Sequence, residues 1–152
     1  MRWGAAWALA AGCGEGADPP GSPTVDVVSV EVTGADGGYT FAVGLRSDET
    51  GCDRYADWWE VVDADGALLF RRILDHSHPD DQPFVRDGGP VPVGARDALI
   101  VRGHLACEGC GDGFAGTAMR GSVADGFEVW TPPDGFAAAL ADAEPLPEGC
   151  LF

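Results

Sequence analysis

Lysine is absent from the sequence. All nine basic residues are arginines, and 25 acidic residues bring the formal net charge to −16 in a chain of 152 residues. The absence of lysine excludes Schiff-base enzymes, lysine-containing phosphate loops and the ATP-binding lysine of kinases. An acidic chain without a basic cluster also argues against nucleic acid as a partner.

Long apolar runs are also missing, since no stretch reaches the roughly 18 residues that a membrane-spanning helix needs. The N-terminal apolar run is short and ends in residues 9–13 (LAAGC), which resemble the lipobox of bacterial lipoproteins. The resemblance predicts a signal peptide over residues 1–12 and a lipid anchor on Cys13. An ordinary signal peptide followed by an unrelated cysteine is the alternative. Residues 13–23, rich in glycine and proline, are expected to form a flexible tether.

The chain has five cysteines, an odd number that needs a reason in a secreted protein. Lipidation of Cys13 leaves an even set, Cys52, Cys107, Cys110 and Cys150, which suits an oxidising compartment. Three pairings of these four are open. The short loop from Cys107 to Cys110 favours that pair together with Cys52–Cys150. The predicted location is extracytoplasmic, at the envelope of a bacterial cell.

Residues 24–126 consist of short β-type runs separated by turns rich in glycine, aspartate and proline. Apolar residues alternate cleanly in 39–47, whereas in 24–33 they change face midway, which predicts a bulge or a passage between sheets. No amphipathic helix separates the runs, which argues against a βαβ fold. We expect an all-β domain, an immunoglobulin-like antiparallel β-sandwich of about seven strands. Residues 127–152 are expected to form an acidic tail rich in proline and alanine.

Three histidines are placed where they could share a metal ion. His76 and His78 point to the same side of an extended segment, and His104 ends the apolar run at 98–105. Three imidazoles suit a copper or zinc site, with a carboxylate or a tyrosine as a further ligand. The alternative is that His76 and His78 are solvated or capping residues and that His104 bonds the backbone.

The sequence between Cys107 and Cys110 has the Cys-x-x-Cys spacing of several functional motifs. It lacks the helix start of a thioredoxin-type pair, and Gly111 stands where a haem-attachment motif has histidine. A zinc cluster would need a second cysteine pair. A disulfide that closes the loop is the favoured interpretation.

Residues 53–60 are rich in aromatic and acidic side chains and contain two adjacent tryptophans, Trp58 and Trp59. These two point to opposite faces if they lie on a strand. One is expected in the core. The other is expected to face outward, where it could stack on a sugar or a partner together with Tyr55 and Asp57. The ordinary alternative is that the tail covers it.

Three spaced elements resemble a small family of uncharacterised secreted bacterial proteins and lipoproteins. They are residues 55–59 (YADxW), residues 76–86 (HxHxxxQPFxR) and residues 101–104 (VRxH). The resemblance implies that five of these side chains form one cluster in the fold, and it implies no particular reaction. The five are His76, His78, Gln82, Arg86 and His104.

We therefore expect a lipid-anchored, non-enzymatic binding module, with an envelope protein or a metal ion as partner. The candidate binding residues are Tyr55, Asp57, Trp58, Gln82 and Arg86. A periplasmic copper- or zinc-binding protein that uses the three histidines is the first alternative. A hydrolase is the second, although the sequence carries no G-x-S-x-G or H-E-x-x-H signature.

Overall fold

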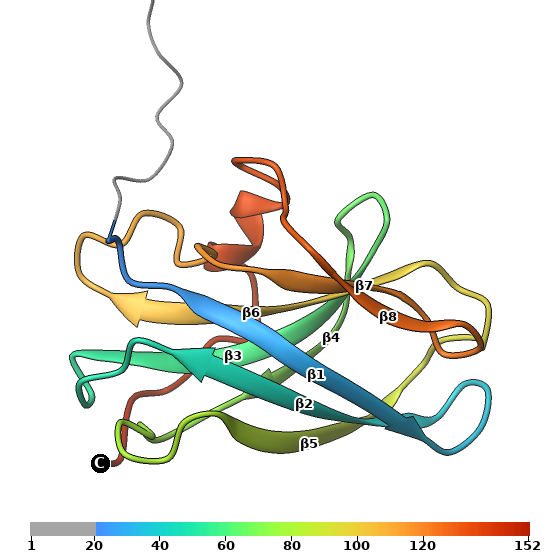
Figure 1. Cartoon of the computed structure of the whole chain (residues 1–152), viewed down its shortest axis with the longest axis horizontal. Helices are drawn as coiled ribbons and strands as arrows, with labels where there is room; N and C mark the ends of the chain where they lie inside the picture. Colours follow the sequence, from blue (N-terminus) through green and yellow to red (C-terminus); the bar gives the residue numbers. More distant parts are fainter. Residues whose placement is uncertain (1–20) are drawn as a thin grey trace, which may run out of the picture.

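The computed structural model describes residues 21–152, so the predicted signal peptide, Cys13 and most of the tether lie outside the described residues. Eight strands form two antiparallel sheets that pack face to face (Figure 1). The three-stranded sheet has the order β1-β2-β5 and the five-stranded sheet the order β4-β3-β6-β7-β8. This confirms the predicted all-β sandwich, and its immunoglobulin-like nature stays a prediction. Within the described chain, no helix is long and apolar enough to cross a membrane.

The elements follow one another with short connections. Their bounds are β1 Val25–Thr33, β2 Tyr39–Ser47, β3 Arg54–Asp63, β4 Leu68–Ile73, β5 Phe84–Val91, β6 Leu99–Cys107, β7 Ala118–Ser122, β8 Gly126–Trp130, and a 3₁₀ helix at Ala138–Asp142.

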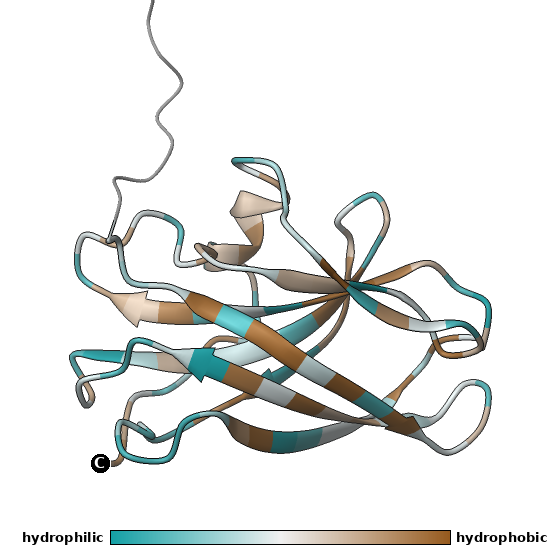
Figure 2. Cartoon of the chain, in the orientation of Figure 1, coloured by the Kyte–Doolittle hydropathy of each residue, from teal (hydrophilic) through white to brown (hydrophobic). Residues whose placement is uncertain are grey.

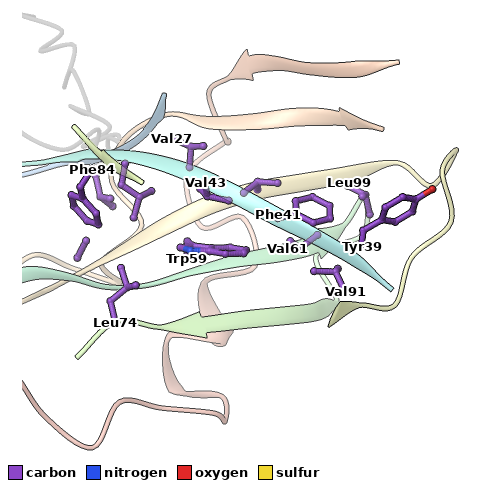
Figure 3. Packing of buried hydrophobic residues seen from close by; sticks show 14 of the residues in the cluster. Val27, Tyr39, Phe41, Val43, Trp59, Val61, Leu74, Phe84, Val91 and Leu99 are labelled. Carbon is purple, nitrogen blue, oxygen red and sulfur yellow. The ribbon is translucent and has the colours of Figure 1, made fainter. Parts of the chain in front are cut away.

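The core lies between the two sheets because each strand turns alternate residues inward. Figure 2 shows this alternation of apolar and polar residues along β1 and β2. Phe41, Val43 and Leu45 of β2 are fully buried, and Trp59 and Val61 of β3 meet them from the other sheet (Figure 3).

Strand β1 contains the predicted irregularity. Its register against β2 shifts between Val27 and Ser29, so the apolar face changes there. Before the shift, the amides of Val25 and Val27 donate to the carbonyls of Ala115 and Thr117, in the segment that leads into β7. The first half of β1 thereby joins the two sheets.

The sheet continues into the segment expected to be a tail. Strand β8 forms because its residues pair with β7, and because Phe127 packs edge-on against Phe41 at 6.1 Å between ring centroids. Residues 131–152 follow β8. Residues 136–145 bond to Arg71 and Arg102 on the outer face of the five-stranded sheet, the face turned away from the core, and residues 150–152 bond to Cys52 and to the loop after β4. We refer to residues 131–152 as the tail.

Two disulfides close the fold. Cys52, in the loop between β2 and β3, pairs with Cys150 near the end of the tail, and Cys107 pairs with Cys110 after β6. This is the pairing that the sequence favours.

Candidate functional site

The residues that the sequence singles out fall into two polar clusters. One lies on the outer face of the five-stranded sheet, and we call it the outer-face network: Asp57, Trp58, Glu60, Arg71, Arg102 and His104. The other lies where β2 ends and β5 begins, and we call it the histidine end: Ser47, Glu49, His76, His78, Gln82 and Arg86.

Strand register builds the outer-face network. The pairing of β3 with β6 sets Trp58 opposite His104 and Glu60 opposite Arg102. The register of these strands shifts between Ala56 and Trp58, and Asp57 therefore reaches the imidazole of His104.

Glu60 is the centre of the outer-face network. Its carboxylate accepts hydrogen bonds from Nε of Arg71 at 2.8 Å, Nε of Arg102 at 2.8 Å and the indole of Trp58 at 3.1 Å. The side chains of Glu60 and Arg71 are fully buried, and that of Arg102 is 3% exposed. Burial lowers the pKa of Arg102, whereas Glu60 opposes this shift. A carboxylate buried at this depth needs such partners to remain charged.

The tail supplies the remaining acceptors for the two guanidinium groups. Arg71 donates to the carbonyls of Leu140, Ala143 and Pro145. Arg102 donates to two further tail carbonyls, those of Phe136 at 2.7 Å and Ala137 at 3.0 Å. Every N–H group of Arg71 thus has an acceptor, counting its second contact with Glu60 at 2.6 Å.

Trp58 is the outward-facing tryptophan, and it is covered. Its ring stacks on His104 at 3.6 Å between centroids and lies 4.2 Å from the Arg71 guanidinium, which the tail caps. Trp58 is only 2% exposed, and Tyr55 and Asp57 are buried as well. The expectation of an exposed binding surface at Tyr55, Asp57 and Trp58 is therefore wrong. The alternative of a covered tryptophan holds, since Trp58 packs against His104 and against the Arg71 guanidinium that the tail caps.

Asp57 and His104 form a buried pair with 2.5 Å between Oδ1 and Nδ1. Burial raises the pKa of Asp57, and the bond to His104 opposes that rise. The imidazole of His104 also packs edge-on against Phe114 at 4.9 Å. Its Nε2 lies against Gly113, where a Cβ would approach the nitrogen to 2.2 Å, so His104 is enclosed by its neighbours.

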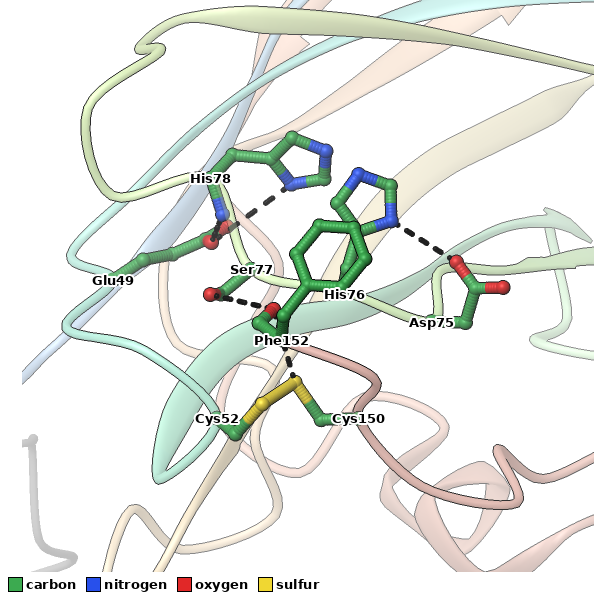
Figure 4. Close-up of a disulfide and its surroundings, with 8 residues drawn as sticks. All are labelled: Glu49, Cys52, Asp75, His76, Ser77, His78, Cys150 and Phe152. Atoms are coloured by element: carbon green, nitrogen blue, oxygen red, sulfur yellow. Dashed lines mark hydrogen bonds and ion pairs between the residues drawn. A yellow bond between two sulfur atoms is a disulfide. The ribbon is translucent and has the colours of Figure 1, made fainter.

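Glu49 organises the histidine end (Figure 4). Its fully buried side chain accepts hydrogen bonds from the hydroxyl of Ser47 at 2.6 Å, the amide of Ala56 at 3.2 Å and the amide of His78. The ring of His78 stacks on Phe84 at 3.9 Å between centroids.

Gln82 ties the same loop to β2. Its carbonyl oxygen accepts from the amide of Ser47 at 2.9 Å, and its amide donates to the carbonyl of His78 at 3.0 Å. The rings of His76 and His78 lie 4.4 Å apart between centroids. Of the cluster implied by the family resemblance, the structure brings together all but one residue: His104 belongs to the outer-face network.

Arg86 fixes the tautomer of His78. One terminal nitrogen of its guanidinium lies 2.5 Å from Nε2 of His78, and since guanidinium only donates, Nε2 must accept. The imidazole proton therefore sits on Nδ1, which faces Glu49 at 3.9 Å. Burial, and then the charge of Arg86, lower the pKa of His78 and keep it neutral.

These contacts do not assemble the predicted copper or zinc site. Nε2 of His78 is taken by Arg86, and His104 is enclosed beside Asp57, apart from the pair at His76 and His78. Among residues 21–152, no group of three or more His, Cys, Asp or Glu side chains is arranged to hold a metal ion. The set His76, His78 and His104 is thus not formed in this structure.

The sequence interpretation missed the residues that anchor both clusters. Glu60, Arg71 and Arg102 each interrupt an apolar strand with a charge, a pattern that indicates buried pairing between strands. Glu49 gave no comparable signal, since it sits in an acidic loop between two other polar residues.

The tail leaves part of the outer face open. A groove of about 770 Å³ runs beside it over β6, β7 and β8. Its lining includes Ile100 of β6, Arg120 of β7, Trp130 of β8 and, from the tail itself, Phe136.

Comparison with known proteins gives one similarity. No family model matches the chain, and no solved structure matches it. A protein of Halomicrobium mukohataei named "Putative lipoprotein" is 41% identical over 88 residues, which are 57% of this chain. The chain spans 43% of the length of that relative.

Replacing Glu60 by alanine is expected to destabilise the fold by about 3–5 kcal/mol, because it leaves two buried guanidinium groups without their carboxylate. The free energy of unfolding from urea denaturation measures this. The matched control is Glu128→Ala, which breaks the exposed ion pair with Arg120 and should cost about 1 kcal/mol or less. Equal losses in the two variants would contradict the role assigned to Glu60.

The neutral state of His78 predicts a pH dependence. As the pH falls below the ordinary histidine pKa of 6.5, the unfolded chain takes up a proton that the folded chain refuses, so stability falls until the lowered pKa is reached. Histidine NMR titration should place the pKa of His78 below 6.5 in the native chain and nearer that value in Arg86→Ala. A native pKa at or above 6.5 would refute the assignment.

Proposed function

We propose that the chain is a lipid-anchored, extracytoplasmic binding module without catalytic activity. Cys13 carries the anchor, residues 13–23 form the tether, and the β-sandwich is the binding domain. The observation that carries the proposal is the cysteine pairing. Cys52, Cys107, Cys110 and Cys150 bond to one another, which leaves Cys13 as the odd cysteine in the lipobox-like segment.

Two further observations support this location. Two disulfides in one small domain suit an oxidising compartment outside the cytoplasm. The relative named "Putative lipoprotein" is similar over more than half of this chain, and its printed name agrees with a lipid anchor.

A binding role fits the way in which the polar side chains are used. His78, His104, Glu49 and Glu60, the groups best suited to chemistry, make their bonds within the domain. Their surroundings favour a rigid scaffold over a reactive centre, since each ring or carboxylate is packed and bonded to fixed neighbours. The open groove over β6, β7 and β8 is then the surface at which the domain meets its ligand.

Changing Cys13 to serine is expected to move the protein from the membrane fraction to the soluble fraction, because acyl chains supply the anchor and each buried methylene contributes about 0.8 kcal/mol. Cell fractionation followed by immunoblotting measures this, and intact mass of the native protein should show acyl groups. The control is the double variant Cys107→Ser, Cys110→Ser, which removes a cysteine pair and should stay with the membrane. A Cys13→Ser chain that remains in the membrane fraction would overturn the proposal.

A further inference from the structure

The groove over β6, β7 and β8 differs in charge from the rest of the molecule. Acidic residues outnumber basic ones by 25 to 9 in the chain, whereas the groove is lined by two of each sign. The basic pair is Arg96 and Arg120, and the acidic pair is Asp125 and Glu128. The lining residues themselves therefore give no net local preference for a cation or an anion, unlike the acidic surface around them.

The lining of the groove presents a donor and an acceptor side by side. Nε of Arg120 lies 3.2 Å from Oε1 of Glu128, and the side chains are 54% and 71% exposed, so both remain open to a ligand. A hydroxyl group can accept from the guanidinium and donate to the carboxylate at once, as neither an anion nor a cation can. An anion would meet Glu128, and a cation would meet Arg120.

The lining of the groove includes two aromatic side chains in contact, Trp130 of β8 and Phe136 of the tail. Trp130 packs edge-on against Phe136 with 5.3 Å between ring centroids, and the Arg120 guanidinium lies 5.9 Å from the centroid of the Trp130 ring. Trp130 is only partly buried, so part of its surface stays available beside the exposed ion pair. An indole of this kind offers an apolar contact to a flat ligand at low entropic cost.

We propose that this groove binds a neutral saccharide chain, with a sugar ring against Trp130 and its hydroxyl groups on Arg120 and Glu128. The inference rests on the proposed function, because it names the ligand class of that binding module. A sugar combines what the groove offers, namely an apolar ring face and adjacent hydroxyl groups that both donate and accept. The volume of about 770 Å³ suits a short stretch of such a chain.

Isothermal titration of the purified full-length Cys13→Ser chain tests this with defined probes. The neutral probes are cellohexaose, maltohexaose and chitohexaose, the anionic probe is hexagalacturonic acid, and the cationic probe is a glucosamine hexamer. We expect at least one neutral probe to bind, more tightly than both charged probes. Trp130→Ala should weaken that binding about tenfold or more, and Arg120→Ala should weaken it as well.

The matched control is Val129→Ala, which removes an exposed side chain from the neighbouring position of β8 and outside the groove lining. It should leave the affinity unchanged, and thermal unfolding should show that every variant is folded. Absence of binding by all three neutral probes, tighter binding of a charged probe, or full affinity in Trp130→Ala would overturn the proposal. Binding is measured on purified protein, so its outcome is independent of whether Cys13→Ser leaves the membrane.

Discussion

The buried carboxylate of Glu60 is the interaction on which the outer face of the sandwich depends. The one carboxylate of Glu60 faces two buried guanidinium groups, so it cannot by itself accept from all the charged N–H groups that leave water there. Burial of such a charge costs several kcal/mol unless polar groups replace the lost hydration. Five backbone carbonyls of the tail do so, at Phe136, Ala137, Leu140, Ala143 and Pro145. The tail is therefore part of the fold.

This arrangement decides which surface is left for function. The tail covers the part of the outer face that holds Arg71 and Arg102, and it leaves open the groove over β6, β7 and β8. At the histidine end, Glu49 and Arg86 hold His78 in one orientation and one tautomer. Both clusters thus position strands and loops, and the ligand-binding role that we propose lies beside them, at the charge-balanced groove.

Features that depend on neighbouring residues could be predicted from the sequence, whereas features that depend on register could not. Strand β2 follows from the alternation of Tyr39 to Ser47, and the bulge in β1 follows from the change of face among its valines. His104 lies on strand β6, whereas His76 and His78 lie in the loop between β4 and β5, and spacing along the chain does not encode how that loop and that strand are placed. The pairing of Glu60 with Arg71 and Arg102 likewise requires the register of three strands and the path of the tail. In the sequence, this pairing is indicated only by the charged residues that interrupt apolar strands.

Hydrogen exchange of the tail in a chain without the Cys52–Cys150 disulfide tests the central claim most directly. If the outer-face network holds the tail, the amides of Leu140 and Ala143, which are bonded within the short helix and its end, should stay protected in the Cys52→Ser, Cys150→Ser variant. That protection should disappear when Glu60→Ala is added. If both amides exchange at the unprotected rate as soon as the disulfide is removed, the disulfide holds the tail, and the role assigned to Glu60 is wrong.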